Sequence, residues 1–142
     1  MWYNVLEVAK YIISRCSELG NPVSNLKLQK MLYFVWIEFY KRTGRTLFFD
    51  DICAWQLGPV VPTVYYEFCQ YAGQPIFAFY STEISNEDMY TLDEIIDEFI
   101  DVPAHELVQR THRKGTAWDE IYQNGAGNRK VIPYSLIKER DA

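Results

Sequence analysis

Residues 54–68 read AWQLGPVVPTVYYEF, and two prolines three positions apart make this stretch the strongest constraint on the fold. Proline fixes its own φ angle and disfavours a helical conformation at the preceding residue. Gly58 and Val61, which precede the two prolines, are therefore expected to be extended. A run with helical spacing begins at Pro62 or Thr63, so the stretch is predicted to be a stiff corner that aims a helix.

Two long helices are predicted before this corner. Apolar residues recur every three or four positions over residues 2–19, and a glycine and a proline then end the stripe. Ser24 suits the N-cap of a second helix over residues 25–43, which a glycine follows. Because this helix is apolar on nearly every side after Met31, it is predicted to be the central helix of a bundle.

Shorter elements are predicted in the rest of the chain. Residues 46–58 lose the helical period and carry β-favouring side chains, which predicts one or two short strands, and residues 75–85 alternate as a strand does. A last short strand is expected near residues 130–133. Further helices are expected at residues 63–72, from residue 85 or 91 up to residue 102, and at residues 103–111, 118–122 and 133–140. The fold class is therefore mainly α, a compact domain of about five to six helices with a small accessory β-hairpin or sheet.

Charge is distributed unevenly along the chain, whose net charge is -5. Between Thr46 and Gln109 there is no Lys or Arg, although twelve of the nineteen carboxylates lie there. Such a segment repels phosphate backbones and attracts cations, so a basic protein rather than nucleic acid is the expected partner. Asp93 and Asp97 lie on a carboxylate-rich helix face that is either a docking surface or an ordinary solvated exterior.

Several functional classes lack their usual sequence signals. No apolar run is long enough to span a membrane, and Glu7 interrupts the N-terminal apolar pattern of a signal peptide, so a cytoplasmic protein is expected. His105 and His112 do not have the spacing of a metalloprotease motif, and no metal or cofactor is expected. A small hydrolase that uses Cys53 or Cys69 with His112 remains an alternative.

Aromatic residues make up 16% of the chain, which is more ring surface than a domain of this size buries easily. Some of these rings are therefore expected on a partner-binding face. The competing interpretation is structural, in which Trp55 and the two prolines only fix the following helix to the core.

Three stretches occur in a fixed order: LKLQKMLYFVW at residues 26–36, LFFDDICAWQLGPVVPTVYYEF at 47–68 and THRKGTAW at 111–118. The second contains the pattern Ala-Trp-x-x-Gly-Pro-Val-x-Pro-x-x-Tyr, and the third places a His six residues before a Trp. Over residues 24–122 the chain resembles the Panacea antitoxin domain, also called SocA-like, of bacteria and phages. Residues 123–142 would then be a C-terminal extension of one domain that spans residues 1–142.

The resemblance implies a mostly helical fold and a non-enzymatic role. Members of this family neutralise toxins that are encoded beside them by direct binding, and one member delivers its toxin to a protease. The implied partner is a cognate, basic toxin, with a protease or chaperone as a further partner; a phage-borne inhibitor of a host protein is the alternative. The expected partner-binding residues are Trp55, Gly58, Pro59, Val60, Pro62, Tyr65, Asp93, Asp97, His112 and Trp118.

Overall fold

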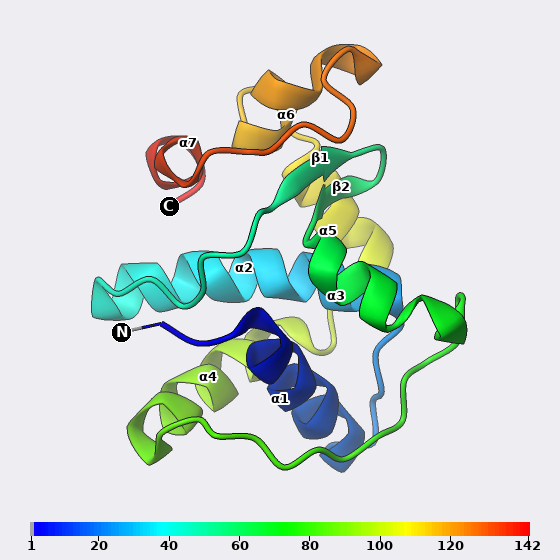
Figure 1. Cartoon of the computed structure of the whole chain (residues 1–142), viewed down its shortest axis with the longest axis vertical. Coiled ribbons are helices and arrows are strands. Elements are labelled where there is room, and N and C mark those ends of the chain that lie inside the picture. The colour runs from blue at the N-terminus through cyan, green and yellow to red at the C-terminus, as the bar shows by residue number, and fades with distance from the viewer. Residues whose placement is uncertain (1) are drawn as a thin grey trace.

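Figure 1 shows the computed structural model, which describes residues 2–142. In chain order its helices and strands are Val5–Glu18 (α1), Asn25–Thr43 (α2), Cys53–Trp55 (β1), Gly58–Val60 (β2), Pro62–Glu67 (α3), Asn86–Phe99 (α4), Ala104–Thr111 (α5), Ala117–Tyr122 (α6) and Tyr134–Arg140 (α7). The predicted mainly α class with a small β-hairpin is confirmed. The described residues form seven α-helices, one more than the upper predicted number, and two of them, α3 and α6, have only six residues.

Helix α2 has the bounds that the sequence predicts and crosses the middle of the molecule (Figure 1). The Ser24 hydroxyl caps its N-terminus by accepting from the amide of Lys27, and Gly44 ends it with a left-handed φ of 72°. Helices α1 and α4 lie on one side of α2, whereas the β-hairpin, α6 and α7 lie on the other. The buried indole of Trp36 donates to the carbonyl of Phe48, which holds the loop after α2 against it.

Helix α4 begins at the earlier of its two predicted starts. The Ser85 hydroxyl accepts from the amide of Asp88, so Ser85 is the N-cap. A start at Thr91 is wrong because the Thr91 hydroxyl donates to the carbonyl of Glu87 within the helix. The helix predicted at residues 63–72 is divided into α3 and a 3₁₀ turn, Cys69–Tyr71.

The strand predicted at residues 75–85 does not form. This segment is extended, but it makes only one isolated bridge, between Ile76 and Val23, and otherwise runs beside α1. Two serine hydroxyls of α1 take the place of a neighbouring strand, as described below. Near the C-terminus, Val131 makes a single bridge to Cys53 and so flanks the free side of β1.

Among residues 2–142, none of the helices has the length and apolar character that crossing a bilayer requires.

Candidate functional site: the Gly-Pro corner and its groove

Pro59 lies in a tight antiparallel hairpin that leads directly into α3, which begins at Pro62. Strand β1 pairs with β2 so that Trp55 faces Gly58 and Ala54 faces Pro59. Val61 is extended, as predicted, with φ -95° and ψ 101°, and Pro62 occupies the first turn of α3. The corner therefore connects β2 and α3 with almost no loop between them.

Gly58 fits this corner for two independent reasons. Its φ is +115°, a backbone conformation that L-residues with a side chain rarely adopt. A Cβ atom at this position would also lie 2.8 Å from the hydroxyl oxygen of Thr111 and 3.0 Å from Cε of Lys30. Gly58 thus lets the hairpin backbone approach α2 and α5 closely.

Three polar side chains from the first turns of α2 hold the corner by hydrogen bonds. The Lys30 ammonium donates to the carbonyl of Pro59 over 2.6 Å, and the side-chain oxygen of Gln29 accepts from the amide of Val61 over 2.9 Å. The Gln29 amide also donates to Asn25, whose own amide donates to the carbonyl of Tyr65. All three side chains are buried. Their polar groups therefore need hydrogen-bond partners within the protein, and these bonds supply them.

Lys30 is a charged group in an apolar position. It is fully buried, and no carboxylate of residues 2–142 forms an ion pair with it. Burial lowers the pKa of its ammonium to about 7 because the charged form loses its hydration. The hydrogen bond to Pro59 satisfies one of the three donors of the ammonium. The protonated form of Lys30 is therefore less favourable in the folded chain than in water.

A stack of three rings supports the hairpin from behind. The indole N–H of Trp118, on α6, donates to the carbonyl of Trp55 over 2.7 Å. The Trp118 ring lies between His112, at a centroid distance of 3.9 Å, and Tyr122, at 4.5 Å, and both pairs are nearly parallel. Burial, together with the nearby positive charge of Lys30, lowers the pKa of His112.

The Trp55 ring forms the outer part of the site. It meets Tyr65 edge to face at a centroid distance of 4.9 Å, and the guanidinium of Arg129 lies 4.3 Å from its centroid. The amide of Arg129 donates to the carbonyl of Ala54, which fixes the arginine beside β1. A charged group over the face of an indole is attracted by its quadrupole, so Trp55 and Arg129 form a wall of aromatic and cationic surface.

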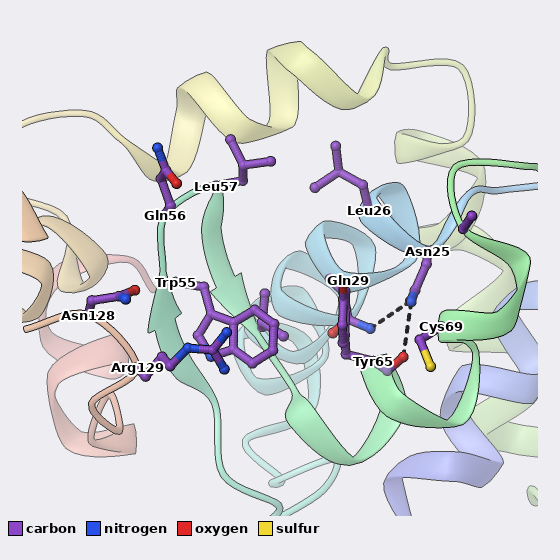
Figure 2. A pocket seen from close by; sticks show the side chains of 12 residues that line it. Asn25, Leu26, Gln29, Trp55, Gln56, Leu57, Tyr65, Cys69, Asn128 and Arg129 are labelled. Carbon is purple, nitrogen blue, oxygen red and sulfur yellow. Dashed lines mark hydrogen bonds between the residues drawn. The ribbon is translucent and has the colours of Figure 1, made fainter.

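Beside this wall lies a groove of about 440 Å³ between the hairpin, α2 and α3. Figure 2 shows Arg129 over the Trp55 ring, with Gln29 and Asn25 farther along the groove. Leu57, at the hairpin tip, is 52% exposed and contributes apolar surface at the rim. The complete lining is Asn25, Leu26, Gln29, Trp55, Gln56, Leu57, Val60, Tyr65, Cys69, Ala72, Asn128 and Arg129.

The structure divides the ten residues that the sequence singled out into three groups. Trp55, Val60 and Tyr65 line the groove. The glycine and prolines of the corner shape its backbone, with Gly58 and Pro59 buried, and His112 and Trp118 lie behind the hairpin. The third group is Asp93 and Asp97, on α4.

Asp93 and Asp97 lie on the other side of α2 from the hairpin (Figure 1). Both face Arg15 of α1: its guanidinium is 2.7 Å from Asp97 and 3.7 Å from Asp93. The Tyr11 hydroxyl also donates to Asp93 over 2.6 Å. The two carboxylates therefore connect α1 with α4 and do not belong to the corner.

The arrangement of thiols and histidines does not resemble a nucleophilic site. Burial raises the pKa of the Cys53 thiol, which lowers its thiolate fraction. Cys69 is exposed, and its thiol donates to the carbonyl of Tyr66. His112 stacks on Trp118, and its Nε2 has no hydrogen-bond partner within residues 2–142.

Sequence reasoning missed the three buried polar side chains of α2, Asn25, Gln29 and Lys30, as well as Arg129. The only sequence signal was the concentration of polar residues in the first turns of α2, before the helix becomes apolar on all sides. Buried polar side chains require hydrogen-bond partners, and here most of the partners are backbone groups of the corner.

Comparison with known proteins places this chain in a family. The family model for the antitoxin SocA-like, Panacea domain matches residues 28–119, which include most of α2, the corner and two of the supporting rings, His112 and Trp118. The chain is also 32% identical over 136 residues to Antitoxin SocA of Caulobacter vibrioides (strain NA1000 / CB15N), covering 84% of this chain and 70% of that protein. The chain belongs to the SocA-like, Panacea-domain antitoxin family. No solved structure matches it.

Proposed function

We propose that this protein is a non-enzymatic antitoxin that binds a cognate toxin and blocks it by direct contact, with the groove beside Trp55 as its binding surface. Membership of the antitoxin family supports the role. The observation that supports the surface is the rigid attachment of the corner to α2 through Lys30, Gln29 and Asn25. The proposal keeps the cytoplasmic location expected from the sequence.

A fixed corner favours binding because little conformational entropy remains to be lost. Two prolines and a set of buried hydrogen bonds hold the backbone beneath Trp55 and Leu57, so a partner meets a surface that is already ordered. Large rings beside apolar rim residues are typical of interface hot spots. The net charge of -5 makes a basic toxin the expected partner.

Co-expression with the product of the neighbouring open reading frame tests this proposal. The unsubstituted chain should restore growth of cells that express the neighbouring protein. Trp55→Ala with Leu57→Asp should lose that protection, whereas Tyr90→Ala, which removes a ring that is 72% exposed on α4, should keep it. Circular dichroism of each purified variant checks that the fold survives.

The thiol alternative makes the opposite prediction. Cys53→Ser and Cys69→Ser should leave protection intact if binding alone is sufficient. Loss of protection in Cys69→Ser, with full protection in the Trp55 and Leu57 variant, would contradict the proposal and favour a catalytic thiol.

A further inference from the structure

A second surface lies on the extended segment between α3 and α4, the long trace that passes beside α1 in Figure 1. Side chains of α1 hold one edge of this segment. The hydroxyl of Ser17 accepts from the amide of Ala78 over 3.1 Å, and the hydroxyl of Ser14 accepts from the amide of Tyr80 over 2.8 Å. The amide of every second residue is thus directed at α1.

The opposite edge of the same segment is free. Within residues 2–142, the backbone N–H and C=O groups of Phe77 and Phe79 have no hydrogen-bond partner. Their rings are 64% and 59% exposed and meet edge to face at a centroid distance of 5.2 Å. An extended edge with unpaired backbone groups is a template for another strand, and residues 76–84 contain no lysine to guard it.

Negative charge lies along the α1 side of this segment. Glu18 shares a hollow with Tyr80 and Thr82 on the α1 side, and the amide of Glu83 is bonded to the carboxylate of Glu7. None of these three glutamates forms an ion pair within residues 2–142.

A fourth carboxylate, Glu67, acts on the same segment, and two cations lie beside it. Burial raises the pKa of Tyr80, and the charge of Glu67 adds to that shift. The Lys10 ammonium lies 5.4 Å from the centre of the Tyr80 ring. Arg15 lines the same hollow as Glu18, but its guanidinium is paired with Asp93 and Asp97. A second copy of the chain would bring the same negative charge, whereas a basic strand complements it.

We propose that the Phe77–Phe79 edge docks an extended, basic segment of a partner protein by main-chain pairing. The free N–H and C=O groups pair with the partner backbone, the two rings cover its apolar side chains, and the glutamates attract its cations. No residue of 75–81 lines the Trp55 groove, so this surface is separate from that of the proposed function and does not depend on it.

The probe is a fluorescein-labelled ten-residue peptide of alternating Val and Lys, with an alternating Val and Glu peptide as the charge-reversed control. At low salt the Lys peptide should bind at least about tenfold more tightly than the Glu peptide, and added salt should reduce this preference. Amide hydrogen exchange followed by NMR locates the bound peptide. Phe77 and Phe79 should exchange quickly in the free protein and at least about tenfold more slowly with the peptide, whereas Ala78 and Tyr80 should be protected in both.

Matched variants test the rings. Phe77→Ala with Phe79→Ala should weaken peptide binding at least about fivefold, and Tyr90→Ala should leave it unchanged. The exposed position of both rings makes unfolding of the double variant a small risk, and the exchange measurement on the unsubstituted protein needs no variant. The proposal is overturned by equal affinity for the two peptides, by no detectable binding, or by protection that appears in the Trp55 groove and not at Phe77 and Phe79. None of these results alters the outcome of co-expression with the Trp55→Ala and Leu57→Asp variant.

Discussion

The Gly-Pro corner and the acidic face of α4 use their polar groups in opposite ways. At the corner, the polar side chains of Lys30 and Gln29 are buried and bond the backbone. On α4, the carboxylates are partly exposed and pair with arginines of other helices, Asp97 with Arg15 and Glu98 with Arg42. The corner is thus a fixed shape with one exposed cation, Arg129, at its surface, and the α4 face carries charge that is largely compensated.

This difference changes how the cation-free segment should be understood. The sequence separates its carboxylates from every Lys and Arg, which suggests an open acidic surface. Folding brings Arg15 and Arg42 from α1 and α2 against α4, so much of that field is cancelled. Uncompensated negative charge remains beside the segment at residues 75–85 instead. Charge segregation along a chain therefore does not establish segregation at its surface.

The largest effect is expected for Gly58→Ala. The substitution forces a side chain into a positive φ and against Thr111, so it should lower the free energy of unfolding by about 4 kcal/mol. Gly44→Ala is the matched control because its φ is +72° and its Cβ would meet open space, so only about 1 kcal/mol should be lost. Urea denaturation measures both. Equal losses would show that the close approach at the corner is unimportant.

Lys30 gives the corner a pH dependence. Its pKa is about 7 in the folded chain, against about 10.4 for an unfolded lysine. Between these values the unfolded chain binds the extra proton, so stability should rise with pH, by about 3 kcal/mol from pH 7 to pH 9.5. It should fall again as the pH returns to 7.

Lys30→Met isolates this contribution. The variant removes the titrating group and keeps an unbranched side chain, so the rise of the unfolding free energy between pH 7 and pH 9.5 should be smaller by about 3 kcal/mol. Urea denaturation at the two pH values measures the difference. Parallel pH profiles for the two proteins would mean that Lys30 is not neutral in the folded state above pH 7.

Trp118→Phe should have an intermediate effect. The change keeps the ring stack with His112 but removes the indole donor to the carbonyl of Trp55, so about 1.5 kcal/mol should be lost. Trp2→Phe, at a site that is 58% exposed, is the matched control and should change stability by less than about 0.5 kcal/mol. Thermal unfolding compares them, and a loss no larger than that of the control would remove the support assigned to this bond.

The smallest effect is expected on α4. Asp93→Asn with Asp97→Asn breaks an exposed ion pair, so it should cost less than about 1 kcal/mol. These two carboxylates should contribute only weakly to the electrostatic steering of a partner. The association rate of the double variant with a basic partner at low salt should therefore fall less than about threefold. Stopped-flow mixing with the neighbouring gene product measures the rate. A tenfold fall would place the main electrostatic surface on α4 and reverse the comparison.

Local signals made part of the fold predictable. The bounds of α2 follow from a serine that caps its own helix and a glycine that adopts a left-handed φ, and both act within a few residues. Prolines restrict their immediate neighbours, so the corner at Val61 was also accessible from sequence. The rings at Trp55 and Tyr65 were identified because a large aromatic side chain is informative wherever it stands.

The rest depends on contacts between distant parts of the chain. Lys30 reaches the carbonyl of Pro59, and Arg15 reaches Asp97, and no local pattern specifies either pair. Residues 75–85 alternate as a strand does because one side packs on the protein, but Ser14 and Ser17 of a helix replace the neighbouring strand. Alternation reports one-sided burial and does not identify the element that covers it.

The most direct test of the central claim is the affinity of the purified chain for the neighbouring gene product, measured by isothermal titration calorimetry. If the fixed corner is the binding surface, Trp55→Ala with Leu57→Asp should raise Kd at least about 100-fold, while Tyr90→Ala leaves it unchanged. An unchanged Kd for the folded corner variant would contradict the account.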